Sequence, residues 1–537
     1  MLAAPLLATA APTTPLLVLL LAMVRFAAAE RDAPRALAAR RTPPYQQWRR
    51  VDGRTNYRRR LLTGGVHLPR RQWRQPTAAA AQVGEQLARH QRHFLASTVN
   101  PVMNHWRSIH DKLQVQSTWP GNGRYSDETS LLFTTGDYIR REGYSVERHT
   151  VITDDGYNLT LHRIPYGKNE DPSTVSRKPA VLVQHGILCS STDWVIAGQN
   201  SSLAFVLSDA GYDVWLANSR GNTYSRNHVT LLPAKDPEKY WDFSWHEMGT
   251  IDLPNTIDYI LDKTGEPDLN YVGHSMGTAI FFVLCSERPE YQEKVRSMAA
   301  MAPIAYLNHV KSPIMTFLSS VADPLAWLCN SLGYYEFRPN GKILLFAGKA
   351  FCEANPHAEG ICDNLLFLYA GFDSKRLIKN ILPIILAHTP AGASARQLTH
   401  FAQLMKRDRW FGQYNYNQQK NMEKYGQPEP PAYDLSQVAV PVALYHAQND
   451  WLSTMEDVNV LAKELPNVVE KKVMPFPEFN HLDFLWANDI RDIVYEDLIR
   501  FMKRYDRKYP NQVPIQLSPD VDVNVVHPDY IIDSIGQ

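Results

Sequence analysis

Apolar runs that alternate with helix-prone runs mark the middle of the chain. Strand-like apolar runs lie at 178–184, 269–272 and 440–446, and each ends in polar, turn-forming residues. The segment at 278–284 is apolar at nearly every position, which predicts a buried helix, and a last strand is expected at 471–476. Strands that alternate with helices predict a mostly parallel sheet flanked by helices, the α/β class.

The alternation stops after Pro303 and resumes near Val438. Most apolar side chains of the intervening segment are expected in a core. An insertion of this length also predicts a mainly helical cap, with an apolar pocket beneath it. Its helix-prone apolar stretches lie at 314–318, 343–346, 365–369 and 381–386.

The most informative motif follows the strand at 269–272. Residues 273–277 read Gly-His-Ser-Met-Gly, which is a G-x-S-x-G pattern between a predicted strand and a predicted helix. A nucleophile elbow requires this context, and its glycines avoid a collision across the tight turn. Ser275 is therefore the candidate nucleophile. The alternative is an ordinary Gly–Ser turn before a core helix.

A serine nucleophile needs a histidine base and a carboxylate that orients the base. In α/β-hydrolases these follow the serine in the order acid, then histidine. Asp450 lies just after the strand at 440–446 and is the candidate acid. The alternative is that Asp450 caps a helix starting near 453–454. Asp457 is a weaker rival, because it falls inside that helix.

Two histidines follow Asp450. His481 lies in the loop after the last predicted strand, whereas His527 lies in a polar tail with no strand before it. His481 is therefore the candidate base. His274 is expected to point away from the nucleophile, and His446 is expected within its strand.

The oxyanion of a tetrahedral intermediate needs preorganised N–H donors. The residue after the nucleophile, Met276, is expected to supply one backbone N–H, and Ile187, in the loop after the strand at 178–184, the other. Gly186 lets this backbone approach the substrate closely. A plain turn after a strand is the alternative.

From about residue 127 to 503 the chain resembles the animal acid lipases, the family of gastric and lysosomal acid lipases. The resemblance covers several distinctive motifs as well as the elbow. They are D-G-Y at 155–157, R-I-P-Y-G at 163–167, Q-H-G-I at 184–187, A-G-Y-D-V-W-L at 210–216, N-S-R-G-N at 218–222, D-L-P at 252–254, P-A-G at 390–392 and N-H-L-D-F at 480–484.

The resemblance implies an α/β-hydrolase fold and hydrolysis of triacylglycerols or cholesteryl esters, with no metal or other cofactor. By position, the family's nucleophile, acid and base fall on Ser275, Asp450 and His481, and its oxyanion donors on Ile187 and Met276. Met276 is a departure, because members of this family more often carry Gln there. Catalysis is expected to survive the departure, since the donor is a backbone N–H.

The resemblance also implies the domain organisation of the chain. The hydrolase core is expected at 126–305 and 435–505, and a cap at 306–434 with a mobile lid at about 340–371. A polar tail follows at 506–537. Lid opening would expose apolar surface to a lipid–water interface, which suits an insoluble substrate.

The five cysteines are too few for a disulfide scaffold. Cys352 and Cys362 close a small loop, and the family has a disulfide in this region, so these two are expected to pair. The sequons at Asn158 and Asn200 fit a secreted glycoprotein. The other three cysteines are expected to be buried or free thiols: 189, 285 and 329.

The N-terminus predicts a signal peptide over 1–29. Its apolar run at 16–24 is followed by three alanines, although no basic residue precedes it and Arg25 interrupts its end. The protein is therefore expected to be secreted or lysosomal. Nine apolar residues are too few to span a bilayer; with the upstream segment, an uncleaved signal anchor that tethers the protein to a membrane is the alternative.

Residues 30–125 predict a basic, disordered leader. Thirteen arginines fall between Arg31 and Arg74, with little apolar periodicity to build a core. A propeptide, an arm attracted to anionic lipid or a dispensable leader all fit this composition. The net charge of +1 hides an asymmetry, because residues 1–125 carry a surplus of 14 positive charges and the remainder a net −13. The acidic remainder argues against nucleic-acid binding.

The sequence therefore predicts a lipase of 537 residues that acts on neutral lipid esters at a lipid–water interface, with no obligate protein partner. Two other classes stay open. The same elbow serves hydrolases of other esters and thioesters, and a non-catalytic lipid-binding or storage protein could use a lipase scaffold.

Overall fold

In the computed structural model, the described residues all belong to the unit Gly123–Gly536. The described residues are 131, 133–173, 176–331, 333–337, 370–371 and 376–506. The predicted signal peptide at 1–29, the leader at 30–125, nearly all of the lid at 340–371 and the tail beyond 506 lie outside the described residues.

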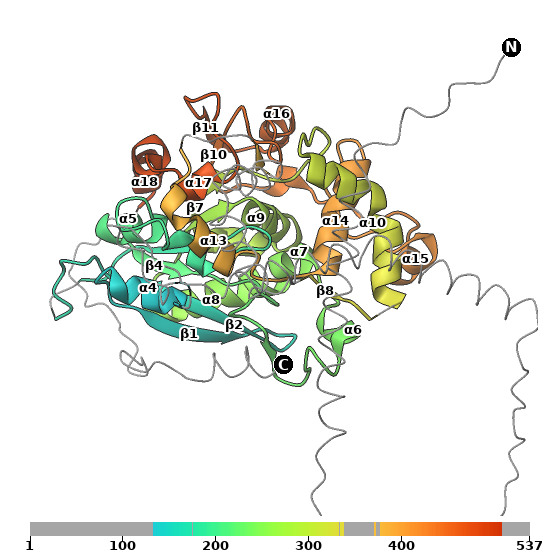
Figure 1. Ribbon diagram of the computed structural model, residues 1–537, viewed down its shortest axis with the longest axis horizontal. Helices are drawn as coiled ribbons and strands as arrows, with labels where there is room; N and C mark the ends of the chain where they lie inside the picture. Colours follow the sequence, from blue (N-terminus) through green and yellow to red (C-terminus); the bar gives the residue numbers. More distant parts are fainter. Residues whose placement is uncertain are drawn as a thin grey trace, which may run out of the picture. The chain divides into compact units, whose positions relative to one another are not determined.

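A nine-stranded sheet forms the centre of the described fold (Figure 1). Its order is β1-β2-β4-β3-β6-β7-β10-β11, and β5 pairs with β2. The strands from β4 to β11 are parallel, whereas β1, β2 and β5 pair antiparallel. The predicted α/β class is confirmed. The strands are β1 (Glu147–Ile152), β2 (Tyr157–Ile164), β3 (Ala180–Gln184), β4 (Asp213–Leu216), β5 (Asn227–His228), β6 (Leu269–His274), β7 (Val295–Met301), β10 (Val442–His446) and β11 (Val468–Val473).

The central strands are apolar throughout because both faces of the sheet are covered. In β3, Leu182 joins one core cluster, whereas Val181 and Val183 join the other. One face is covered by α8 (Leu253–Thr264), α9 (Met276–Glu287) and α16 (Met455–Glu464). The opposite face is covered by α5 (Leu203–Asp209), α17 (Asp483–Trp486) and α18 (Glu496–Lys503).

Short helices complete the body around the sheet. Local sequence explains where some helices begin or end. Thr134 and Asp137 form a reciprocal capping box at the start of α4, and Gly265 ends the longer helix α8 in the left-handed conformation. The short helices are α4 (Thr135–Arg141), η3 (Ser191–Trp194), α6 (Pro237–Tyr240), α7 (Trp245–Glu247), η4 (Met248–Asp252), η5 (Pro289–Lys294) and η8 (Arg491–Tyr495).

The described part of the insertion between β7 and β10 is mainly helical. Its helix α14 carries Phe401 and Leu404 into the same core cluster as Trp245 and Phe411, so the insertion shares a hydrophobic core with the body. The elements are α10 (Pro313–Ser331), β8 (Glu336–Phe337), η6 (Lys379–Ile381), α13 (Leu382–His388), β9 (Ala393–Ser394), α14 (Ala395–Lys406), α15 (Gln418–Tyr425) and η7 (Leu435–Gln437).

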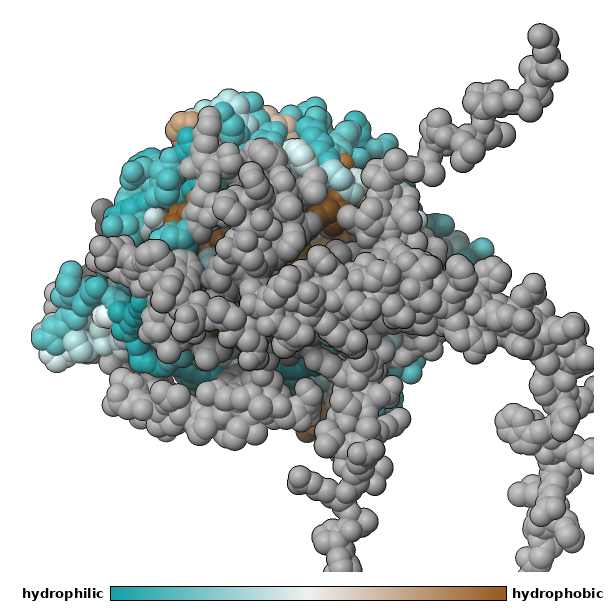
Figure 2. All heavy atoms as spheres, in the orientation of Figure 1, coloured by the Kyte–Doolittle hydropathy of each residue, from teal (hydrophilic) through white to brown (hydrophobic). Residues whose placement is uncertain are grey.

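The described surface in the view of Figure 2 is mainly hydrophilic, with hydrophobic atoms visible near its centre. Apolar side chains are instead concentrated in the two clusters on either side of the sheet. Within the described residues, no helix has the length and hydrophobicity that a membrane span requires.

Candidate active site

Ser275 lies in the sharp turn between β6 and α9. Its backbone has φ 54° and ψ −119°, a conformation that residues with a side chain seldom adopt. The backbone N–H of Ser275 donates a hydrogen bond to the carbonyl of Met301 at the end of β7, 3.1 Å away. The turn is therefore strained and held by the neighbouring strand, as a nucleophile elbow requires.

Both glycines of the elbow are required by close backbone contacts. A Cβ at Gly277 would lie 2.5 Å from the carbonyl oxygen of Gln184. A Cβ at Gly273 would lie 3.0 Å from the backbone of Gly277. The helix α9 can therefore start directly against β3 only because these positions carry no side chain.

The predicted acid and base are in direct contact. Asp450 follows β10, His481 follows β11, and the Nδ1–H of His481 donates to Oδ2 of Asp450 over 2.8 Å. The other carboxylate oxygen accepts the backbone N–H groups of Leu452 at 2.9 Å and Ser453 at 2.7 Å. Both side chains are buried. This contact leaves Nε2 of His481 as the ring atom able to exchange a proton with a nucleophile.

The rival interpretations of this region fail. Thr454, not Asp450, is the N-cap of α16. Asp457 instead binds Nδ1 of His309 over 2.7 Å and accepts a hydrogen bond from the Thr454 hydroxyl. Asp450 is thus the carboxylate that contacts His481, the candidate base.

A short piece of the insertion joins the loops of the acid and the base. The carbonyl of Ala370 accepts the N–H of Trp451 at 3.2 Å and the N–H of His481 at 3.4 Å. The side-chain amide of Asn480 donates to the carbonyl of Gly371 at 3.0 Å. The last two residues of the predicted lid therefore contact the loops of both candidate residues, Asp450 and His481.

The loop after β3 lies against the nucleophile. A Cβ on Gly186 would lie 3.1 Å from Cβ of Ser275, so glycine is needed there. His185 holds this loop: its Nδ1–H donates to the carbonyl of Gly186 at 2.7 Å, and its Nε2 accepts the N–H of Ser219 at 3.1 Å. Burial lowers the pKa of His185 to about 4, which keeps the ring neutral. Ile187, the predicted donor, follows Gly186 in this loop.

Two family models match the chain. One, for a partial alpha/beta-hydrolase lipase region, matches residues 135–198, and one for the alpha/beta hydrolase fold matches residues 179–335. Lipase 3 of Drosophila melanogaster is 40% identical over 379 residues, which are 69% of this chain and 93% of the relative. The chain belongs to the acid lipase family.

Other similar proteins include mammalian lipases. The gastric triacylglycerol lipase of Mus musculus is 40% identical to this lipase over 67% of the chain and 89% of the relative. The lysosomal acid lipase/cholesteryl ester hydrolase of Macaca fascicularis is 38% identical over 70% of the chain and 92% of the relative. The resemblance seen in the motifs is confirmed.

Met276, the departure from the family pattern, is held by a residue that sequence reasoning missed. Gln397 of α14 directs its amide Nε2 to the sulfur of Met276 at 3.3 Å and to the sulfur of Met248 at 3.8 Å. Its Oε1 accepts the N–H of Ser394 at 2.8 Å, which completes the cap of α14. The pattern Ser394-x-x-Gln397 was a signal for the helix cap, but not for this contact between the insertion and the elbow.

His274 was expected to point away from the nucleophile, and it contacts His481, the candidate base. Its Nε2 lies 3.0 Å from the backbone carbonyl oxygen of His481, and the two rings are 4.8 Å apart between centroids. The only sequence signal was its place as the last residue of β6, at the edge of the sheet where the catalytic loops meet.

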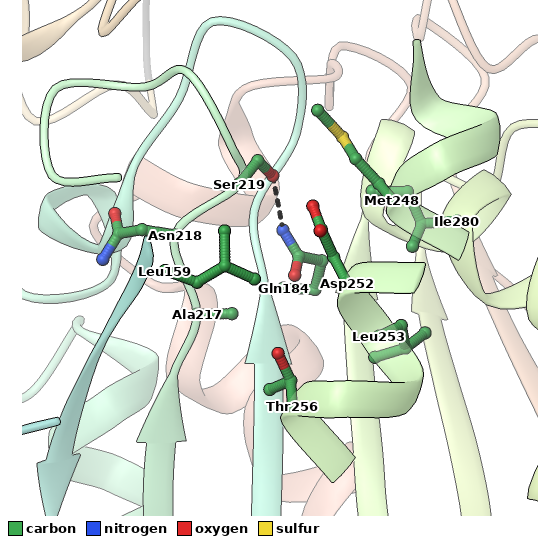
Figure 3. Close-up of a pocket in the computed structure, with 10 residues that line it drawn as sticks. All are labelled: Leu159, Gln184, Ala217, Asn218, Ser219, Met248, Asp252, Leu253, Thr256 and Ile280. Atoms are coloured by element: carbon green, nitrogen blue, oxygen red, sulfur yellow. Dashed lines mark hydrogen bonds between the residues drawn. The ribbon is translucent and has the colours of Figure 1, made fainter. Parts of the chain in front are cut away.

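A small pocket lies on the α8 side of the sheet (Figure 3). None of the predicted triad residues lines it. Its polar side includes Gln184, whose Nε2 donates to the hydroxyl of Ser219 at 3.0 Å. Asp252 faces it and is paired with the buried Arg220. The lining residues are Leu159, Gln184, Ala217, Asn218, Ser219, Met248, Asp252, Leu253, Thr256 and Ile280.

The other predicted sites differ in their surroundings. Asn200 is exposed in a turn before α5, whereas Asn158 lies half-buried in β2 with its Oδ1 shielded from solvent.

The predicted disulfide partners Cys352 and Cys362 lie outside the described residues. In the described residues, no group of three or more His, Cys, Asp or Glu side chains is arranged to hold a metal ion. Cys189 and Cys285 are buried free thiols.

Proposed function

We propose that this lipase hydrolyses carboxylic ester bonds of neutral lipids with Ser275 as nucleophile, His481 as base and Asp450 as acid. The observation that carries the proposal is the buried 2.8 Å contact between His481 and Asp450, at the sheet edge where Ser275 stands in a strained elbow. The names of two relatives, a triacylglycerol lipase and a cholesteryl ester hydrolase, support the substrate class.

The chemistry is a two-step acyl transfer. The hydroxyl oxygen of Ser275 attacks the ester carbonyl while its proton passes to Nε2 of His481. The backbone N–H groups of Ile187 and Met276 stabilise the oxyanion. His481 then protonates the leaving alcohol, which departs and leaves a fatty acyl ester on Ser275. A water molecule, deprotonated by His481, releases the fatty acid and restores the serine.

Asp450 keeps the base in one tautomer throughout. Its carboxylate accepts the Nδ1–H of His481 and stabilises the imidazolium that forms in each step. The two backbone N–H groups on its other oxygen fix the carboxylate. No cofactor enters this reaction.

The proposal extends to the setting of the reaction. The mainly helical insertion, with its lid at 340–371 and a disulfide between Cys352 and Cys362, would cover an apolar acyl site that opens at a lipid–water interface. A signal peptide at 1–29 would direct the protein to secretion or the lysosome. Asn200 is the better glycosylation acceptor of the two sequons, because it is exposed and Asn158 is half-buried.

The test compares wild-type protein and Ser275→Ala on emulsified long-chain triacylglycerol and cholesteryl ester from pH 4 to 8. We expect the wild type to prefer long acyl chains over short soluble esters and to bind a phosphonate serine probe covalently. Ser275→Ala is expected to lose turnover and labelling and to keep the wild-type circular dichroism spectrum. Substantial residual turnover in this variant would refute the nucleophile.

Two further outcomes would change the function. A preference for short esters or thioesters would indicate another hydrolase class on the same fold. A wild-type protein that neither reacts with the probe nor releases fatty acid would indicate a non-catalytic lipid-binding protein.

A further inference from the structure

His274 occupies a buried position between three parts of the active site. It is the last residue of β6 and precedes the nucleophile Ser275. Its ring lies beside the ring of His481, and the edge of the Trp194 ring faces it from the other core cluster at 6.5 Å between centroids. A histidine in this place either packs in the core without a role in the reaction or helps to position the reacting groups.

The hydrogen bond of its ring decides which nitrogen carries the proton. Nε2 lies 3.0 Å from the carbonyl oxygen of His481, and a carbonyl only accepts, so Nε2 is the donor. Among the described residues, Nδ1 has no hydrogen-bond partner. A Cβ on Gly186 would lie 3.3 Å from this atom, so Nδ1 faces the loop that carries Ile187.

The ring is built to stay neutral beside a base that becomes charged. Burial, together with repulsion from His481, lowers the pKa of His274 well below its ordinary value. A neutral ring donates to the carbonyl of His481 without placing a second positive charge next to the imidazolium that forms during each turnover.

The carbonyl that His274 binds belongs to His481 itself, whereas the other hydrogen bonds of this loop, such as that from the Asn480 amide to the carbonyl of Gly371, hold its neighbours. The N–H of His481 reaches the carbonyl of Ala370 over 3.4 Å, a long hydrogen bond. The side chain of His481 is hydrogen-bonded at Nδ1 to Asp450, and its ring lies beside that of His274. The hydrogen bond from the His274 side chain to the His481 backbone therefore acts on the residue whose Nε2 must face the nucleophile.

We propose that His274 is a positioning residue, which holds the backbone of the base His481 through its Nε2–H and packs against the oxyanion loop at Gly186. The inference rests on the proposed function, because it assigns His274 a role in the same reaction. A misplacement of a reacting group by about 1 Å can cost on the order of 10²-fold in rate.

The test uses two substitutions of similar size. In His274→Gln the amide Nε2 stands at the same distance along the side chain as the ring Nε2 and can keep the bond to His481. In His274→Met the donor is absent. We expect kcat on a long-chain ester to fall about 10- to 100-fold in His274→Met, with KM within about twofold of the wild type, and to stay within about threefold in His274→Gln. The phosphonate labelling rate should fall in parallel with kcat.

His400 offers a matched control in the same protein. It is also fully buried, and its Nε2 likewise donates to a backbone carbonyl, that of Gly412, at 3.0 Å. His400 lies on α14 of the insertion, stacks on Trp245 of α7 and does not contact the triad. His400→Met removes the same kind of bond, together with the 3.1 Å bond between Nδ1 and the Ser244 hydroxyl, and we expect kcat to stay within about threefold of the wild type.

Each outcome bears on the inference. Equal loss in His274→Gln and His274→Met, or equal loss in His274→Met and His400→Met, would make His274 a core residue only and overturn it. Should His274→Met fail to fold, His274→Asn takes its place, because the shorter amide cannot reach the carbonyl of His481 and should show the same loss. A wild-type protein without ester turnover would refute the proposed function instead.

Discussion

At the scale of single residues, environment separates side chains of the same type. Asp450 and Asp457 both follow β10, yet only Asp450 meets His481, and Asp457 is turned to His309 and the cap of α16. The difference lies in their place in the chain: Asp450 lies in the turn after a parallel strand, whereas Asp457 lies in the first turn of α16.

Asp450→Asn and Asp457→Asn should therefore have different effects, the first on kcat and the second on the stability of α16. In Asp450→Asn the amide can donate to Nδ1 of His481 and favour the wrong tautomer, so we expect kcat to fall by on the order of 10⁴-fold. Asp457→Asn should keep kcat within about threefold and lose roughly 1 kcal/mol of stability at the helix cap. Steady-state kinetics and chemical denaturation measure both, and comparable kcat values for the two variants would contradict the assignment.

At the scale of elements, the catalytic loops depend on a contact from the insertion. Ala370 accepts hydrogen bonds from the loops of both Asp450 and His481, through Trp451 and His481 themselves. The following residue, Gly371, has φ +116° and lies so close to the chain that a Cβ would be 2.0 Å from the carbonyl oxygen of Asn449. We therefore expect the insertion to set the spacing between Asp450 and His481.

Gly371→Ala should disturb that spacing. Its new methyl group overlaps backbone, so we expect a loss of more than ~2 kcal/mol in stability, with a lower kcat because the loop before Asp450 must move. Gly426→Ala is the matched control, because Gly426 also has a positive φ of +71° but no atom lies within 4 Å of its Cβ position. It should cost only about 1 kcal/mol and leave kcat unchanged. Equal effects in the two variants would show that φ alone, and not the contact, matters.

At the scale of the whole molecule, buried titratable groups make stability depend on pH. Burial lowers the pKa of His162 and His400 to about 3 and that of His185 and His446 to about 4. Unfolded histidines take up protons near pH 6.5, so this stability is fully present above pH 6.5 and is lost as the pH falls toward 4. Asp193 has the opposite effect on stability. Burial raises its pKa to about 6, so the cost of burying its charged carboxylate disappears as the pH falls from 6 toward 4.

The free energy of unfolding is therefore expected to decrease between pH 6.5 and 4. His446 gives the cleanest test, since neither of its ring nitrogens has a hydrogen-bond partner among the described residues. His446→Leu should lose less stability than the wild type over this pH range. The difference should be up to about 1.4 kcal/mol for each pH unit that separates the folded and unfolded pKa values of His446. Denaturation at pH 4, 5, 6 and 7 measures it, and a variant with the wild-type pH slope would contradict the assignment.

Local patterns predicted much of the fold. The strand at 440–446 and the helix at 278–284 were visible because apolar runs and turn residues are properties of neighbouring positions. Their edges were less certain: the last strand was expected at 471–476 and lies at Val468–Val473. The alternating exposed and half-buried residues of this edge strand gave a weak apolar signal.

The sequence by itself determined the fold class, the family and the three triad candidates, since the order of Ser275, Asp450 and His481 follows from which strand each one ends. Tertiary structure alone decided that Gln397 reaches the sulfur of Met276 and that His274 binds the carbonyl of His481. These pairs are 121 and 207 positions apart in the chain. Periodicity reports only on neighbours along the chain, and the direction of a side chain toward a distant partner depends on how the insertion and the sheet pack together.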